Sequence, residues 1–270
     1  MKKFLAQLVG LLVYLAIPLY ISSDQCILNN EYAHGFNSVK NLKVMTYNIR
    51  GARTDDGKIE LDTIIQEIKK LDPDILALQE VDYHLPRSHF ENQVEVIGKQ
   101  LEMNYLFVPN LNFVIGSYGN AILSKFPIIE YEYYQLPSES ESRGLVRAQI
   151  NTGTQNIDVY ATHLGLPYTE RVDQVASLNT LIANGPMPKL LLGDFNTKPT
   201  EIPIQSLRSV FIDPVRESHF NLTTYKHKNK ETQLDYILYT NGFTFESALS
   251  DSSTISDHNP LMYSLILSTQ

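Results

Sequence analysis

The segment between Leu42 and Leu78 limits the possible folds more than any other part of the chain. Leu42–Asn48 alternates in part between apolar and polar residues, which is the pattern of a half-buried strand. Ile59–Leu71 then places leucine and isoleucine side chains on one helical face. Asp72–Pro73 ends this helix, because proline disfavours helix in the residue before it. Ile75–Leu78 is a continuous apolar run, typical of a strand buried on both sides. A strand–helix–strand unit of this kind predicts an α/β fold.

The remainder of the chain continues in the same style. We expect two further helices, Gln93–Met103 and Thr169–Ala183. We expect further strands over Tyr105–Val108, Asn120–Ser124, Leu145–Ile150, Ile157–Leu164, Lys189–Leu192, Leu234–Tyr239 and Leu261–Leu267. No internal repeat and no linker divides residues 41–270, and 43% of the 270 residues are hydrophobic. The sequence therefore predicts one α/β domain, with mixed sheets covered by helices.

The first 23 residues differ in composition from the rest. Lys2 and Lys3 precede an uncharged, mostly apolar run of 18 residues, Phe4–Ile21. A basic start followed by an apolar stretch is typical of a signal peptide, and the run is also long enough for a membrane anchor. In both cases the positive charge before the run favours export of the following domain. Residues 24–40 are polar and unpatterned, so we expect a linker there. Cys26 is the only cysteine, which excludes an intrachain disulfide.

The chain is acidic, with a formal net charge of −8. Removal of residues 1–23 takes away two lysines and no acidic residue, which leaves −10. Proteins that grip nucleic acid through its phosphates normally present a basic face. The net charge therefore favours a partner other than a long nucleic acid.

Polar residues gather where the expected strands end. Asn48 ends the first strand and Glu80 follows the second, while His163 and Asp194 end two later strands. His258 precedes the last strand. Any one of these residues is more often a solvated loop or turn residue than a functional one. Strand ends at one edge of an α/β fold converge on a common site, however, and together these residues supply what phosphoryl transfer requires: oxygen ligands for a hard cation, a base and donors.

Eight short strings in this order resemble the endonuclease/exonuclease/phosphatase superfamily, which includes DNase I-like nucleases, inositol polyphosphate phosphatases and neutral sphingomyelinases. The strings are Thr46–Arg50, Leu78–Val81, Gly119–Ser124, Arg143–Leu145, Thr162–Leu164, Gly193–Asn196, Leu234–Ile237 and Ser256–His258. Each string alone is of modest specificity, but the ordered set covers the chain from Asn41 to Leu267. The resemblance implies a four-layer α/β sandwich in which two packed mixed β-sheets are flanked by helices, with residues 41–270 as the catalytic domain.

The resemblance also implies a metal site. Glu80 matches the principal metal ligand of the superfamily, and Asn48 and Asp257 would complete or support the site. Mg²⁺ is the expected ion, with Mn²⁺ as the alternative, because a site of one carboxylate and substrate oxygens suits a small hard cation that keeps several waters.

The same resemblance assigns the catalytic roles. Asp194 matches the residue that orients and deprotonates the attacking water. Asn196 and His163 would hold phosphate oxygens as charge grows on them. His258 matches the catalytic histidine beside the phosphate, and Asp235 the carboxylate that fixes its tautomer and raises its pKa.

Two further residues are expected to bind substrate. Arg143 matches an arginine that lies along the phosphate path in nuclease relatives, and Asn120 lies in the string that precedes it. Abasic-site endonucleases carry a tyrosine six residues and an asparagine three residues before the matching arginine, and this chain has Pro137 and Ser140 at those positions. Two acidic residues, Glu139 and Glu141, flank Ser140. Acidic residues beside this path would repel a polyanion. We expect five other histidines to be solvated: His34, His84, His89, His219 and His227.

We therefore expect an exported, monomeric, metal-dependent phosphoesterase. The favoured substrate is a small or membrane-bound phosphodiester or phosphomonoester, such as a phospholipid head group or an inositol phosphate. A secreted Mg²⁺-dependent nuclease is the first alternative. A catalytically silent binding domain is the second, and it is disfavoured because every expected site residue is present.

Overall fold

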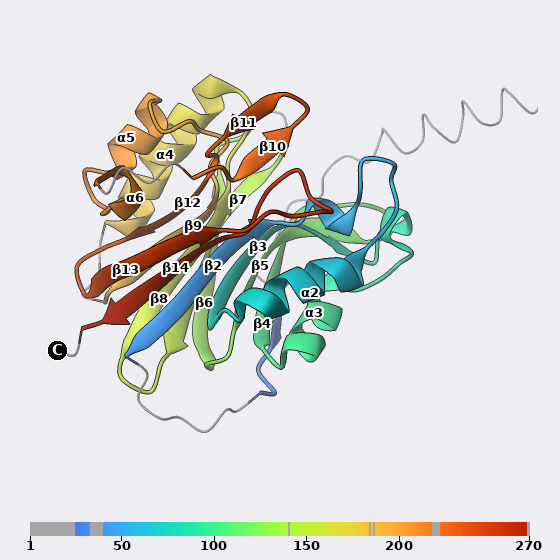
Figure 1. The fold of residues 1–270 in the computed structure, drawn as a ribbon, viewed down its shortest axis with the longest axis horizontal. Coiled ribbons are helices and arrows are strands. Elements are labelled where there is room, and N and C mark those ends of the chain that lie inside the picture. Colours follow the sequence, from blue (N-terminus) through green and yellow to red (C-terminus); the bar gives the residue numbers. More distant parts are fainter. Residues whose placement is uncertain are drawn as a thin grey trace, which may run out of the picture.

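The fold is a four-layer α/β sandwich, as the resemblance implied (Figure 1). The computed structural model describes residues 25–32, 40–139, 141–183, 185, 187–217 and 222–268. The seven-stranded sheet has the order β1 (Ile27–Asn29), β4 (Asn104–Asn112), β5 (Ser117–Ser124), β3 (Ile75–Tyr83), β2 (Asn41–Asn48), β14 (Leu261–Leu267) and β13 (Phe243–Ser250). The five-stranded sheet has the order β12 (Asp235–Tyr239), β9 (Lys189–Asp194), β8 (Asn156–His163), β7 (Arg143–Asn151) and β6 (Ile128–Leu136).

Helices cover the outer face of each sheet (Figure 1). The helices are α2 (Leu61–Leu71), α3 (Gln93–Leu101), α4 (Tyr168–Ile182), α5 (Ile202–Leu207) and α6 (Pro214–Glu217), with short 3-10 helices η2 (Arg50–Ala52) and η3 (Pro86–Ser88). α2 and α3 lie against the seven-stranded sheet, and α4 and α5 lie beside the five-stranded sheet. A small separate hairpin, β10 (Tyr225–His227) and β11 (Lys230–Thr232), stands at the edge toward which the parallel strands run.

Three apolar clusters account for the four layers. The largest lies between the two sheets and joins side chains such as Ile122 and Val159. A second packs α2, through Ile64 and its neighbours, onto the seven-stranded sheet. A third packs α4, including Leu178, onto the five-stranded sheet. The inner strands are apolar on both faces because each face meets one of these clusters.

The parallel strand pairs bring the predicted polar residues to one edge. β2 and β3 run parallel and place Asn48 beside Gln79, next to Glu80. β8 and β9 run parallel and place His163 beside Asp194. The antiparallel strand β12 places Asp235 on the other side of Asp194.

Several elements differ from the sequence expectations. Ile27–Asn29, inside the expected 24–40 linker, forms strand β1 and pairs with β4. β13 was not expected, although Phe243 and Phe245 alternate with polar residues as in a strand with one buried face. The apolar segment 1–23 lies outside the described residues. Among the residues that are described, no helix is long and apolar enough to cross a membrane.

Candidate active site

Asp194 is the centre of the polar cluster at the edge of the five-stranded sheet. It ends β9 and is 1% exposed. The preceding Gly193 has φ 151°, and a Cβ there would lie 2.0 Å from the carbonyl oxygen of Thr162. Only glycine permits this close approach of β8 to β9. As a result His163 Nε2 lies 3.4 Å from Asp194 Oδ2.

His258 lies between two carboxylates. Its Nδ1 is 2.8 Å from Asp235 Oδ2, and its Nε2 is 3.5 Å from Asp194 Oδ2. Burial disfavours the charged ring, but the charges of Asp235 and Asp194 outweigh burial and raise the pKa of His258 to about 10. Burial raises the pKa of Asp194 to about 6, against the opposing charge of His258. At neutral pH this cluster therefore contains an imidazolium beside a carboxylate that is still basic.

His163 and Asn196 complete the surroundings of Asp194. Burial, followed by the charges of Arg143 and His258, lowers the pKa of His163 well below its usual value, so the ring is neutral. The backbone N–H of Asn196 donates to Asp194 Oδ1 at 2.8 Å. The Asn196 side-chain amide donates one N–H to the Leu164 carbonyl, which leaves its second N–H for a ligand.

Glu80 occupies a β-bulge rather than a regular strand position. The bulge in β3 lies between Leu78 and Val81, so that Gln79 and Glu80 lie opposite the single residue Asn120 of β5. Glu80 has φ 60°, in the left-handed region that is uncommon for residues other than glycine. Bulges of this type redirect side chains beside active sites. The half-buried Glu80 carboxylate accepts a hydrogen bond from Asn48 of the neighbouring strand.

Asn48 links Glu80 to Asp194. Its side-chain NH₂ donates to Glu80 Oε1 and to Asp194 Oδ2, each at 3.1 Å. Asp257, next to His258, is partly exposed, with its Oδ1 3.8 Å from Arg50 Nε. Glu80 and Asp257 offer carboxylate oxygens, which fits the preference of Mg²⁺ or Mn²⁺ for hard ligands. Asn48 Oδ1 accepts the Arg50 N–H at 3.0 Å, so Asn48 supports the site by orienting Glu80 rather than by facing it with an oxygen.

A different group of side chains lies close enough together to hold a metal ion. Within the described residues, Asp194, Asp235 and His258 form the one set of His, Cys, Asp and Glu side chains whose ligand atoms all lie within 4.8 Å of one another. A cationic imidazole has no lone pair with which to bind a metal. We therefore interpret this set as a proton-transfer cluster.

Arg143 and Asn120, the expected substrate-binding residues, line the same edge of the fold. Arg143 is 4% exposed, and its Nη1 lies 3.2 Å from Glu141 Oε1. Burial raises the pKa of Glu141, with the charge of Arg143 opposing it. The Nε of Arg143 and the Nδ2 of Asn120 are buried donors without a hydrogen-bond partner among the described residues. Buried donors of this kind need an acceptor, and substrate oxygens would supply one.

Three residues near the site were not singled out from the sequence. The Tyr225 ring contacts the His258 ring edge to face, at 5.0 Å between centroids. The Ser256 hydroxyl donates to the Asn48 carbonyl at 2.7 Å and accepts the His258 N–H at 3.1 Å. His227, expected to be solvated, lines a pocket beside Asp257. Only the position of Ser256 next to Asp257 and His258 gave a sequence signal.

The sequence matches one family model and several curated relatives. The model for the "Endonuclease/Exonuclease/phosphatase family" matches residues 45–258. The "Uncharacterized protein YbhP" of Escherichia coli K12 is 30% identical over 169 residues, which is 57% of this chain and 66% of YbhP. The chain thus spans slightly less than two thirds of the length of the curated relatives that it matches.

Solved structures share the fold at low sequence identity. A protein of the same family from Bacteroides thetaiotaomicron has a TM-score of 0.71 and 20% identity, covering 84% of this chain and 98% of its own. The mannosyl-6-phosphatase Bt3783 of Bacteroides thetaiotaomicron VPI-5482 has a TM-score of 0.68 and 19% identity, covering 84% of this chain and 100% of its own. At this identity the likeness concerns the fold alone.

Proposed function

Because the chain belongs to the endonuclease/exonuclease/phosphatase family, we propose that it is an exported, divalent-metal-dependent phosphoesterase. The observation that carries this proposal is the position of Asp194. Its Oδ2 lies within 3.5 Å of the side chains of Asn48, His163 and His258. A buried basic carboxylate beside an imidazolium and a hard-ligand site matches the needs of phosphate ester hydrolysis.

In this proposal Asp194 orients the attacking water and takes its proton. A pKa of about 6 keeps Asp194 ionised near neutral pH while leaving it basic enough for proton transfer. His258, held by Asp235, presents a charged Nε2–H to a phosphate oxygen. His163 and the second amide N–H of Asn196 hold other phosphate oxygens.

A divalent cation at Glu80, supported by Asn48 and Asp257, would neutralise charge on the phosphate and its leaving oxygen. We propose Mg²⁺ as this ion and Mn²⁺ as its substitute. The bulge at Glu80 supports the assignment, because its partly exposed carboxylate shares the Asn48 amide with Asp194.

The proposed substrate is a small or membrane-bound phosphate ester, either a monoester or a diester. The net charge of −8 and the ion pair that Glu141 forms with Arg143 both disfavour a long polyanion at this edge. The mannosyl-6-phosphatase with the same fold acts on a sugar phosphate by its name, which is compatible with a small ester here. We further propose a monomer that is exported through Lys2, Lys3 and the apolar run Phe4–Ile21.

A substrate screen tests the proposal. Purified protein with Mg²⁺ is assayed against plasmid DNA, RNA, sphingomyelin, phosphatidylinositol lipids and bis-p-nitrophenyl phosphate, with Asp194→Asn as the matched inactive variant. We expect hydrolysis of a small or lipid ester that the variant lacks. Hydrolysis of DNA or RNA alone would support the first alternative, a secreted Mg²⁺-dependent nuclease. A folded protein that hydrolyses none of these substrates with Mg²⁺ or Mn²⁺ would support the second alternative, a catalytically silent binding domain.

A further inference from the structure

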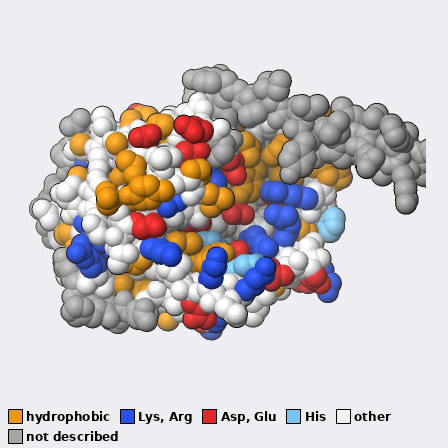
Figure 2. Space-filling model, turned by 90° about the horizontal axis from the view of Figure 1, so that it is seen from above, with side chains coloured by type: hydrophobic (Ala, Val, Ile, Leu, Met, Phe, Trp, Pro, Cys, Tyr) orange, Lys and Arg blue, Asp and Glu red, His pale blue; other side chains and the backbone are white. Residues whose placement is uncertain are grey.

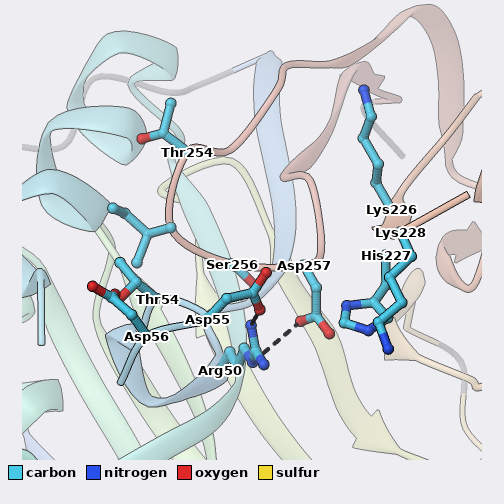
Figure 3. A pocket seen from close by; sticks show the side chains of 11 residues that line it. Arg50, Thr54, Asp55, Asp56, Lys226, His227, Lys228, Thr254, Ser256 and Asp257 are labelled. Carbon is cyan, nitrogen blue, oxygen red and sulfur yellow. Dashed lines mark hydrogen bonds and ion pairs between the residues drawn. The ribbon is translucent and has the colours of Figure 1, made fainter. Parts of the chain in front are cut away.

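The loop that carries Asp257 and His258 is an irregular segment at the surface. It joins β13 to β14 over residues 251–260 and has no helix or strand of its own. In Figure 3 Thr254, Ser256 and Asp257 follow one another along this loop, and the Asp257 side chain points toward Arg50. Figure 2 looks onto the end of the molecule at which the β10–β11 hairpin stands, and it shows basic, acidic and histidine side chains intermingled on this face. The position of the loop on this face therefore depends on side-chain contacts to regular elements.

The carboxylate of Glu67, on helix α2, binds this loop through both of its oxygens. Glu67 Oε1 accepts the Thr254 N–H at 2.8 Å and the Thr254 hydroxyl at 3.1 Å. Glu67 Oε2 accepts the Ser253 hydroxyl at 3.0 Å, across 186 positions of chain. Hydrogen bonds to a carboxylate are roughly twice as strong as those between neutral groups. Glu67 thereby ties the first half of the loop to a helix on the outer face of the seven-stranded sheet.

Tyr47 holds the same carboxylate from the sheet. The Tyr47 hydroxyl donates to Glu67 Oε2 at 2.7 Å, and the Tyr47 side chain is fully buried in β2. Burial, followed by the charge of Glu67, raises the pKa of Tyr47 well above its usual value, so the hydroxyl keeps its proton and remains a donor. Ile64, one turn before Glu67 on α2, belongs to the same apolar cluster as Tyr47. The Glu67 carboxylate is therefore fixed both by its own helix and by the strand that ends at Asn48.

A chain of hydrogen bonds continues from Ser253 to His258. Ser253 Oγ accepts the Ser256 N–H at 3.0 Å, and Ser256 Oγ accepts the His258 N–H at 3.1 Å. The β10–β11 hairpin holds the other half of the loop, since the Lys226 N–H donates to the Asp257 carbonyl at 2.7 Å. The backbone of His258 is thus held from two sides, one of which begins at Glu67. A small displacement of a reacting group lowers the rate steeply, so these contacts bear on catalysis.

We propose that Glu67 is a positioning residue, which holds the loop so that the imidazole of His258 faces Asp194. The inference rests on the proposed phosphoesterase function and adds to it a residue on the far side of the sheet. Glu67 acts through Ser253 and Ser256. A purely structural Glu67 would stabilise α2 and the loop without changing what His258 does in turnover.

Steady-state kinetics at saturating Mg²⁺ test this role. Glu67→Ala should lower kcat about tenfold and leave KM within about twofold, because His258 is displaced while the other phosphate-holding groups stay in place. Glu67→Gln keeps one acceptor oxygen and should lose less. The control is Asp62→Ala, which removes an exposed carboxylate from the same helix and should leave kcat unchanged. A folded Glu67→Ala with normal kcat would overturn the proposal.

A double-mutant cycle separates positioning from stabilisation. If Glu67 acts through His258, adding Glu67→Ala to His258→Ala should lower kcat by less than about twofold more. A tenfold loss that persists in the His258→Ala background would show that Glu67 acts elsewhere, and would overturn the proposal. If Glu67→Ala does not fold, Glu67→Gln and Tyr47→Phe carry the same cycle, with a smaller loss expected from each because the remaining hydrogen bonds are kept.

Hydrogen exchange separates this inference from the proposed function, because it needs no substrate. Glu67→Ala should speed exchange of the Thr254, Ser256 and His258 N–H groups at least ~10-fold, as expected when bonds to a charged acceptor are lost, and leave Leu191 in β9 unchanged. Faster exchange in a protein that hydrolyses no ester would support the loop contact and contradict the phosphoesterase. Unchanged exchange in an active enzyme would overturn the role of Glu67 and leave the phosphoesterase. Unchanged exchange without hydrolysis would overturn both.

Discussion

His258 Nδ1 lies 2.8 Å from Asp235 Oδ2, and this contact places the opposite ring nitrogen toward Asp194. Asp235 is fully buried in β12, and its carboxylate therefore holds one orientation of the imidazole. The same charge keeps the ring protonated. One carboxylate thus controls both the direction and the charge of the group beside the proposed phosphate position.

Removal of either central group should nearly abolish turnover. We expect Asp194→Asn and His258→Ala each to lower kcat at least ~10²-fold, because they remove the base and the charged donor. Asp235→Asn should cost less, since it acts through His258. The measurement is kcat on the best substrate of the screen. A larger loss in Asp235→Asn than in His258→Ala would contradict the supporting role of Asp235.

The raised pKa of His258 predicts how stability depends on pH. A folded pKa of about 10, against 6.5 in the unfolded chain, gives stability that is fully present below pH 6.5 and is lost as pH rises through 10. The raised pKa of Asp194 acts between 3.8 and about 6, outside this window. Urea unfolding in EDTA should show the free energy of unfolding falling by on the order of 1 kcal/mol per pH unit between pH 7 and 10. His258→Gln should remove most of that slope, and an unchanged slope would refute the assignment.

Activity should require a divalent cation that chelation removes reversibly. Glu80→Ala should raise the Mg²⁺ concentration needed for half-maximal rate and lower the rate itself, while leaving the urea midpoint nearly unchanged because Glu80 is only half-buried. The titration of activity with Mg²⁺ and Mn²⁺ measures this. Full activity in excess EDTA would exclude the proposed metal dependence.

The N-terminal segment should direct export. A fusion of residues 1–40 to a reporter that is active only outside the cytoplasm should be active, because Lys2 and Lys3 precede the apolar run Phe4–Ile21. A fusion with Leu11→Arg and Leu12→Arg is the control, since two charges in the run should prevent insertion. A silent reporter with the unmodified fusion protein present would contradict export.

Long double-stranded DNA should be a poor substrate. Glu141 Oε1 lies 3.2 Å from Arg143 Nη1, so a DNA phosphate approaching Arg143 would meet a carboxylate. The comparison is kcat/KM on plasmid DNA against the lipid and inositol esters in identical Mg²⁺ and salt. Glu141→Gln should increase plasmid nicking relative to the small esters. Efficient nicking at physiological salt, with nothing faster in the panel, would make this chain a nuclease.

Local periodicity predicted an α/β domain with mixed sheets covered by helices, whereas the four layers were predicted only through the resemblance to the family. The Leu42–Leu78 segment shows the residue spacing of a strand, a helix and a second strand, which predicts an α/β fold. The ordered strings that resemble the family extend this prediction to Leu267. β1, β10, β11 and β13 were not among the expected strands. β1 has only three residues, which are too few to show the alternation of apolar and polar residues that marks a strand. It is a strand because it pairs with β4.

The identity of the polar residues at the strand ends was likewise readable from the sequence, but their geometry was not. Nothing local shows that Glu80 lies in a bulge with φ 60°, because that conformation follows from its pairing with β5. Nor does sequence spacing show that Glu141 pairs with Arg143.

The sequence by itself determined the family, the α/β class and which side chains are available for phosphate chemistry. The tertiary structure decided which of these side chains meet, as Asp194 meets His258 across 64 positions of chain, and it placed Arg50 beside Asp257. The physical reason is that contact distances and pKa shifts arise from burial and from neighbours on other strands, and only the packed sheets supply those neighbours.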